Sequence, residues 1–181
     1  FLAVLLAYLL AHTIGVFKWR MVVNAAGAGL DLTTSAQCYT GGLFGTLFLP
    51  SIIGGDVVRL AVGLRRSPRP ASVLAGNIAD RFLDVTAQAG LAIAGLILLP
   101  GSLPPGAQAA ARHVLAAFAA VLATAAAVII LLRGVLFRGR SVRFRRRLAH
   151  FRYGIRRISR RPYVLVLGWL MGTFVQGSCV F

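Results

Sequence analysis

Acidic residues are almost missing from this 181-residue sequence, which has four Asp or Glu residues against 20 Lys or Arg. Glutamate does not occur, and a single lysine accompanies 19 arginines. Only 13% of the residues are charged, about half the share typical of soluble domains, and 58% are hydrophobic. A soluble fold of this size could not bury so much apolar surface, whereas lipid can surround it. The composition therefore predicts an integral membrane protein.

Cysteine and histidine are also scarce, which excludes several kinds of site. Cys38 and Cys179 lie far apart in apolar segments, so the sequence predicts neither a disulfide framework nor a metal site. His12, His113 and His150 are scattered, so we expect no metal ligand set, proton relay or cofactor. The basic residues lie between long apolar runs, which favours anionic membrane lipids as partners and argues against nucleic acid.

Four stretches approach the roughly 20 apolar residues that a spanning helix needs. They are Phe1–Phe17, Ala71–Leu99, His113–Leu132 and Tyr163–Phe181. The first is followed by Lys18-Trp19-Arg20, a combination typical of an interface anchor. The chain begins without Met and stops inside an apolar run. We therefore expect a single transmembrane domain over residues 1–181, truncated at both ends and part of a larger bundle.

A fifth apolar stretch, Ala36–Ile53, is rich in helix breakers, with three glycines, Pro50 and then Gly54-Gly55. Basic residues at positions 59–69 follow this stretch and precede the helix from Ala71. They lie on the cytoplasmic side, as the positive-inside rule requires, only if the stretch both enters and leaves the membrane on that side. The sequence predicts an all-α integral membrane bundle of about four spanning helices plus one re-entrant hairpin. The alternative is a full crossing, which would place residues 59–69 outside.

The residue pattern at positions 142–161 predicts an amphipathic, Arg-rich helix on the cytoplasmic side. Its apolar positions follow a 4-3-4-3 spacing and are Phe144, Leu148, Phe151, Ile155 and Ile158. We expect this apolar face to dip into lipid while the arginines meet anionic headgroups. The alternative is that the arginines only enforce topology.

A polar stripe interrupts the apolar helix from Ala71. Its members, spaced by 3, 4 and 4 residues, are Asn77, Asp80, Asp84 and Gln88, with Arg81 at the edge. Such a stripe must face the bundle interior or water, because ionisable groups in lipid are costly. Arg81 can pair with Asp84, which leaves one acid that either meets an Arg from elsewhere or is protonated because it is desolvated. The alternative to a functional site is a clamp between helices.

A second candidate site is centred on Asp56 and Arg59. Pro50 is expected to end the preceding helix, Gly54 and Gly55 to form a tight turn, and Asp56 to cap the following helix. Arg59 lies one turn on, where a lipid phosphate could meet it. The alternative is a capped helix start with a satisfied ion pair.

The sequence YTGGLFGTLFLPSIIGGDVVR at residues 39–59, followed by ADRFLD at residues 79–84, resembles the transmembrane domain of lysylphosphatidylglycerol synthases and their stand-alone, flippase-like relatives. The resemblance implies a multi-helix bundle that binds or translocates a charged or glycosylated lipid. The residues that match this polar signature are Pro50, Gly54, Gly55, Asp56, Arg59, Asp80 and Arg81. No aminoacyl-transfer domain accompanies them here, so the resemblance does not assign synthase activity.

These observations favour a multi-pass protein of the inner plasma membrane that handles lipids. Its polar cavity, open to the cytoplasmic leaflet, would be lined by Asp56, Arg59, Asp80, Arg81 and Asp84. One alternative is a membrane-embedded transferase acting on aminoacyl- or glycosyl-lipids, with Asp80 or Asp84 as general base. Another is an accessory module that anchors a soluble synthase or glycosyltransferase partner.

Overall fold

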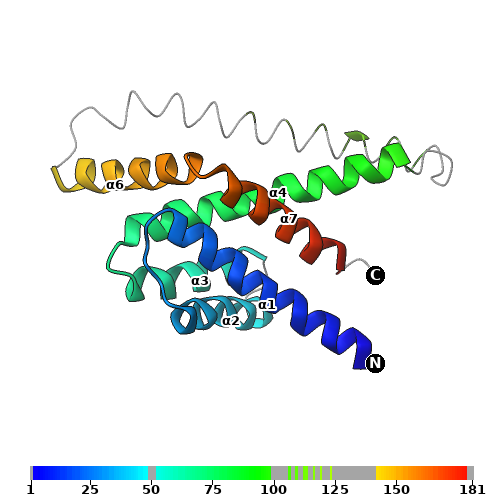
Figure 1. Cartoon of the computed structure of the whole chain (residues 1–181), viewed down its shortest axis with the longest axis horizontal. Coiled ribbons are helices and arrows are strands. Elements are labelled where there is room, and N and C mark those ends of the chain that lie inside the picture. Colours follow the sequence, from blue (N-terminus) through cyan, green and yellow to red (C-terminus); the bar gives the residue numbers. More distant parts are fainter. Residues whose placement is uncertain are drawn as a thin grey trace. The chain divides into compact units, whose positions relative to one another are not determined.

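A computed structural model of the chain describes residues 2–48, 52–98 and 142–178, together with a few isolated residues between 106 and 123 (Figure 1). Every element in these ranges is an α-helix, and none of the described residues forms a strand, as the sequence predicts. The helices are α1 (Leu2–Ala25), α2 (Leu32–Phe48), α3 (Ile52–Arg66), α4 (Pro70–Leu98), α6 (Val142–Ser159) and α7 (Pro162–Ser178).

The chain divides into two compact units, Phe1–Ala87 with Arg147–Phe181, and Gln88–Arg146. The first unit holds α1, α2, α3, α7 and most of α4 and α6, and the candidate site lies within it. Three of the four predicted spans correspond to α1, α4 and α7, whereas the predicted span His113–Leu132 falls outside the continuously described ranges. Within those ranges, α1 is the helix whose length and composition would let it cross a membrane.

The first helix is longer than the sequence predicts. It continues through Lys18-Trp19-Arg20 to Ala25, and its 24 residues span about 36 Å at 1.5 Å per residue. The chain leaves the helix only at Gly27 and Gly29, whose φ angles of 99° and 71° suit glycine. The prediction of an interface anchor is therefore wrong, because Lys18 and Trp19 lie inside the unit, with 4% and 0% of their surface exposed.

Hydrogen bonds fix the turn from α1 to α2. The Asn24 side chain binds both backbone groups of Leu30, donating from Nδ2 at 2.8 Å and accepting at Oδ1 at 2.7 Å. Asp31 then accepts a hydrogen bond from the backbone N–H of Thr34 at 3.2 Å, which satisfies a free donor at the start of α2. Hydrogen bonds from Thr34 also lower the pKa of the exposed Asp31 carboxyl.

Helices α2 and α3 form an antiparallel hairpin whose seam is lined by glycine. A Cβ atom at Gly42 would lie 3.0 Å from the carbonyl oxygen of Gly55, and one at Gly45 would lie 2.8 Å from Val58 Cγ2. The hairpin therefore spans Leu32–Arg66, a wider range than the predicted Ala36–Ile53. The segment forms two packed helices and not one bent helix. The glycines of α2 and α3 have no side chain, so the two backbones can approach each other closely.

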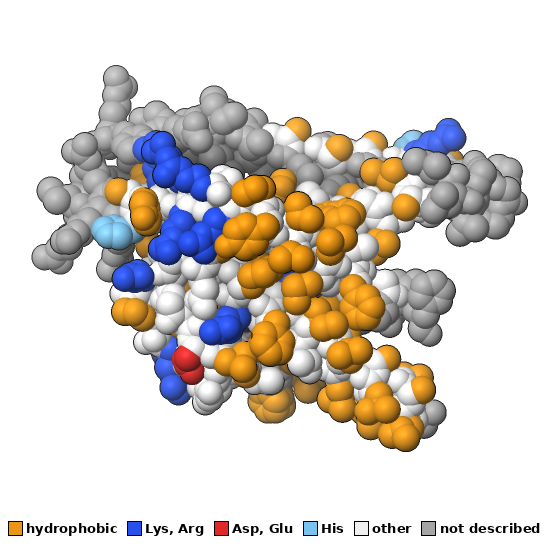
Figure 2. Space-filling view, viewed as in Figure 1, with side chains coloured by type: hydrophobic (Ala, Val, Ile, Leu, Met, Phe, Trp, Pro, Cys, Tyr) orange, Lys and Arg blue, Asp and Glu red, His pale blue; other side chains and the backbone are white. Residues whose placement is uncertain are grey.

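Two apolar clusters surround α1. One joins it to α4, α6 and α7 through residues such as Val22, Ala26, Ala75, Ile158 and Val164. The other joins it to α2, α3 and α4, and its members include Trp19, Val23, Leu30, Cys38 and Val73. Many large apolar side chains of α1 and α7 remain exposed, whereas basic side chains gather where α1 ends and α7 begins (Figure 2).

Helix α6 is present as the Arg-rich pattern predicts, but its apolar face does not point to lipid over the described side chains. Phe151 and Ile155 pack against the first apolar cluster, and Ile158 is buried within it. Gly154 permits this close packing, because a Cβ atom there would lie 3.0 Å from Ala75 Cβ. The expectation of a lipid-immersed face is therefore wrong, because the small residues of α1 and α4 offer a protein surface instead.

Candidate functional site

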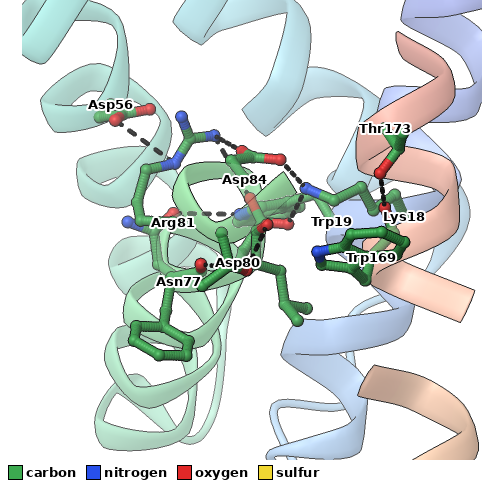
Figure 3. A network of polar contacts seen from close by, with 12 residues as sticks. Lys18, Trp19, Asp56, Asn77, Asp80, Arg81, Asp84, Trp169 and Thr173 are labelled. Atoms are coloured by element: carbon green, nitrogen blue, oxygen red, sulfur yellow. Dashed lines mark hydrogen bonds and ion pairs between the residues drawn. The ribbon is translucent and has the colours of Figure 1, made fainter. Parts of the chain in front are cut away.

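Three helices bring six charged side chains together into one group, which we name the polar cluster (Figure 3). Its members are Lys18 from α1, Asp56 and Arg59 from α3, and Asp80, Arg81 and Asp84 from α4. Three positive charges therefore face three negative charges. The two segments that the sequence singled out separately do meet, as the interpretation of the polar stripe and of the Asp56 motif required.

Close packing of α4 on α1 positions one side of the cluster. A Cβ atom at Gly76 would lie 2.5 Å from Val23 Cα, so only glycine admits α1 at this distance. The next residue, Asn77, accepts a hydrogen bond from the indole N–H of Trp19 at 3.1 Å, and both groups are buried. Asp80 follows one turn later and is fully buried. Asn77 therefore binds Trp19, and its predicted role in a lipid site stays a prediction.

Lys18 holds the two carboxylates of α4. Its Nζ donates to Asp80 Oδ1 at 2.7 Å and to Asp84 Oδ1 at 2.5 Å, and its side chain is 5% exposed. The sequence reasoning missed Lys18, because a basic residue beside Trp19 after an apolar run also fits an interface anchor. A signal was nevertheless present. Lys18 shares a 4-3-4 helical face with three residues that are all buried in the structure, and these are Ala11, Gly15 and Val22.

Arg59 is surrounded by two carboxylates and two aromatic rings. Its Nη2 donates to Asp56 Oδ1 at 2.7 Å and lies 3.9 Å from Asp80 Oδ2. The guanidinium carbon is 5.7 Å from the ring centre of Trp19 and 5.6 Å from that of Tyr39, within the range of cation–π attraction. Contacts on several sides therefore fix the Arg59 side chain.

Arg81 connects α4 to α3. Its Nη2 lies 3.1 Å from Asp84 Oδ2 and 3.3 Å from Asp80 Oδ2, and its Nε lies 3.4 Å from Asp56 Oδ2. These separations exceed the roughly 2.7–2.9 Å of a strong charge-assisted hydrogen bond. The Arg81 side chain is 38% exposed, far more than those of Lys18 or Arg59. Arg81 is thus the most accessible and most weakly held cation of the cluster.

Asp56 does not cap a helix, contrary to the sequence prediction. Helix α3 begins at Ile52, so Asp56 lies inside it, one turn before Arg59. Gly54 and Gly55 are helical too, and do not form the predicted turn. Gly55 instead contacts the backbone of Gly42 across the hairpin. The Asp56 carboxylate instead holds Arg59 and Arg81. Pro50 lies outside the described residues, and Gln88 belongs to the second unit, so their predicted roles stay predictions.

A cavity of about 180 Å³ adjoins the polar cluster between α2, α3 and α4. Its polar lining includes Tyr39, Thr46, Asp56, Arg59 and Arg81. The Nε atoms of both arginines are buried and have no hydrogen-bond partner among the described residues. Because a liquid water molecule occupies about 30 Å³, the cavity has room for several water molecules or a small polar group. The Arg81 Nε already faces Asp56 Oδ2 at 3.4 Å, whereas the Arg59 Nε has no acceptor among the described residues.

Helix α7 closes the opposite side of the cluster. A Cβ atom at Gly172 would lie 3.4 Å from Lys18 Cε and 3.3 Å from Asp84 Oδ1, so α7 packs directly on this ion pair. Because Lys18 and Arg81 contact the carboxylates of Asp80 and Asp84, neither acid is a free general base in this arrangement. No group of three potential metal ligands occurs among the residues that the structure describes.

Comparison with known proteins identifies the family. No curated protein and no solved structure matches the chain. A family model described as the lysylphosphatidylglycerol synthase TM region matches residues 1–180, which is nearly the entire sequence. This match agrees with the resemblance carried by residues 39–59 and 79–84, and a membrane location follows from it. The chain belongs to the family of lysylphosphatidylglycerol synthase transmembrane regions.

Proposed function

We propose that the polar cluster and its cavity bind the phosphate-containing headgroup of a membrane lipid and carry it between the two leaflets. The observation that supports this most is the pair of arginines that line the cavity: the buried Arg59 Nε lacks a hydrogen-bond partner among the described residues, and Arg81 is held only by contacts of 3.1–3.4 Å. Guanidinium groups match phosphate geometry because they donate two parallel hydrogen bonds. A phosphate in the cavity would accept hydrogen bonds from both guanidinium groups.

The charge balance of the cluster suits a site that is alternately empty and occupied. Its three cations and three carboxylates neutralise one another, so the unliganded cluster carries no net charge. Arg81 is accessible and its contacts are long, so an entering phosphate can take it over from Asp80 and Asp84. Lys18 then remains to hold the two carboxylates. Arg59 provides the fixed half of the headgroup site and Arg81 the adjustable half.

The hairpin fits a re-entrant element better than a full crossing. Its arms, as far as the structure describes them, have 17 and 15 residues and pack antiparallel to each other. Both outer ends of the hairpin lie at one end of the unit, because Ser67 Oγ donates to Ala28 O at 3.1 Å. Arg69 reinforces this contact through its hydrogen bond to Gly27 O at 3.0 Å.

That end of the unit is basic, and we propose that it faces the cytoplasm at the inner plasma membrane. Helix α3 ends in Arg65 and Arg66, and Arg157 of α6 lies beside Gly27, just after α1 ends. The positive-inside rule assigns such an end to the cytoplasm. Asp80 would then lie about 15 Å along α4 from Pro70, in the cytoplasmic half of the bilayer. The cavity would receive lipid from the cytoplasmic leaflet.

A conservative substitution separates headgroup binding from a purely structural clamp. Arg59→Lys keeps the positive charge beside Asp56 but removes the Nε donor and the planar fork. In vesicles containing the purified chain, this variant should move a fluorescent anionic lipid at least about tenfold more slowly, because about 1.4 kcal/mol of binding is lost. The matched control is Arg66→Lys, at an exposed position of the same helix, which should leave the rate unchanged.

The thermal stability of both variants completes the test. If the cluster only clamps helices together, Arg59→Lys should lower the unfolding temperature and leave lipid movement by the remaining folded protein at the wild-type rate. The headgroup proposal requires the opposite, namely a folded protein with slow lipid movement. A wild-type rate in Arg59→Lys would therefore reject Arg59 as a headgroup residue.

A further inference from the structure

A second cavity, of about 380 Å³, lies between α1 and the start of α7, on a different set of residues from the polar cluster. Its polar lining is formed by Arg20 and Asn24 from α1 and by Arg161 and Tyr163 at the start of α7. The apolar lining includes Phe17, Met21, Val164 and Met171. The cavity is therefore amphipathic, because the apolar side chains that form much of its wall lie beside two arginines.

The chain has no carboxylate side chain left to neutralise the two arginines of this cavity. Three of its four acidic residues belong to the polar cluster, and Asp31, the fourth, binds Thr34 at the start of α2. Arg20 donates from Nε to the carbonyl oxygen of Leu30 at 3.3 Å, which holds its side chain in place. The Arg161 side chain has neither an ion pair nor a hydrogen bond within the described ranges. No carboxylate among the described residues therefore neutralises these two arginines.

The lining also defines what kind of anion fits. A free inorganic phosphate would use the two arginines but would leave the apolar wall against water, whereas a phospholipid uses both surfaces. Phe17 is 45% exposed, and the apolar surface continues along the outer faces of α1 and α7 through residues such as Leu9, Leu10, Leu167, Leu170 and Phe174. Acyl chains can follow that surface while the phosphate lies at the basic end (Figure 2).

We propose that this cavity is a binding site for one anionic phospholipid, which stays bound as part of the folded protein. Arg20 and Arg161 contact the phosphate, the Tyr163 hydroxyl is an additional donor, and Phe17, Met21 and Met171 contact the acyl chains. Asn24 is not part of the headgroup site, because both its amide groups already bind Leu30. The bound lipid joins α7 to α1 and so secures the helix that closes the polar cluster. This proposal does not depend on the transport proposal, since the two sites share no residue.

Lipid retention measured by native mass spectrometry tests the site. The purified chain in neutral detergent is titrated with phosphatidylglycerol, phosphatidylcholine or inorganic phosphate. The wild-type chain should retain one phosphatidylglycerol that the double variant Arg20→Gln/Arg161→Gln binds at least about tenfold more weakly. The control double variant, Arg65→Gln/Arg160→Gln, loses the same charge at exposed positions outside the cavity and should retain that lipid.

A third variant changes the cavity without changing the charge. Met171→Trp should fill part of the apolar wall and expel the lipid while both arginines remain. Arg59→Lys, which acts on the polar cluster, should leave this lipid bound, so failure of one proposal is distinguishable from failure of the other. Equal loss in the two double variants would overturn the site, as would equal retention of phosphatidylcholine. Displacement of the lipid by equimolar inorganic phosphate would overturn the assignment to a phospholipid.

Discussion

At the residue scale, Lys18 is the buried cation that holds two carboxylates of α4. It is nearly fully buried and is the closest cation to both Asp80 and Asp84. Buried carboxylates that lose a partner keep their desolvation cost without the attraction that offset it. The arginines of the cluster cannot replace Lys18, because the contacts of Arg59 and Arg81 with Asp80 are 3.9 and 3.3 Å long. Lys18 should therefore matter more for folding than for lipid selection.

The variant Lys18→Met should lower the free energy of unfolding by roughly 3–5 kcal/mol, the usual cost of breaking a buried ion pair. The double variant Lys18→Met/Asp84→Asn restores the charge balance of the cluster and should recover part of this loss. Chemical unfolding of the purified chain in detergent measures both effects. Wild-type stability of Lys18→Met would show that Lys18 does not compensate the two acids.

The sequence predicted much of the cluster at the residue scale but not all of it. Helical spacing was sufficient to place Asp80, Arg81 and Asp84 on an inward-facing stripe, and the breaker-rich motif drew attention to Asp56 and Arg59. Lys18 could not be assigned in the same way, because its partner depends on how α1 packs against α4. That packing is set by the contact of Gly76 with Val23, which local periodicity does not contain.

Among the helices, the α2–α3 hairpin is the element that shapes the cavity. Its seam is a backbone-to-backbone contact, because a Cβ atom at Gly55 would lie 2.7 Å from the carbonyl oxygen of Gly42. A flexible side chain could move away from such an atom, but the helix backbone cannot. The spacing of α2 and α3 therefore fixes where Tyr39 and Thr46 lie relative to Arg59.

The variant Gly55→Ala should separate the two arms and destabilise the chain by about 1–3 kcal/mol through overpacking. Lipid movement should fall as well, because the Tyr39 wall of the cavity moves away from Arg59. Gly41→Ala is the matched control, since its Cβ atom would meet only Val58 Cγ1, at 3.9 Å. Thermal unfolding and vesicle assays of the two variants check this. Equal behaviour of both would contradict a glycine seam.

Helix α6 illustrates the limit of sequence patterns at the element scale. The 4-3-4-3 spacing correctly predicts a helix with one apolar face and an Arg-rich remainder. The same pattern does not distinguish lipid from protein as the surface that covers the apolar face. Ala26 of the turn after α1 and Ala75 of α4 offer a shallow protein surface that Gly154 can approach, and this tertiary contact settles the choice.

For the whole molecule, the re-entrant hairpin requires that all connections at the basic end lie on one side of the membrane. A cysteine at Arg66, which is exposed at the end of α3, should react only with reagent applied from the cytoplasmic side. The background chain carries Cys38→Ala and Cys179→Ala to remove the native thiols. Labelling with an impermeant maleimide in intact cells and in inverted vesicles measures this. Reaction from outside alone would instead support a full crossing of α2 or α3.

The most direct measurement of the central claim follows Trp19, which stacks on Arg59 and is one of two tryptophans in the chain. With Trp169→Phe, its emission reports on the cluster as an anionic phospholipid is titrated into neutral micelles. A headgroup site in the polar cluster predicts a saturable spectral change that persists in Arg20→Gln/Arg161→Gln and disappears in Arg59→Lys. An unchanged response in Arg59→Lys, or no response in the parent, would contradict a headgroup site in the polar cluster.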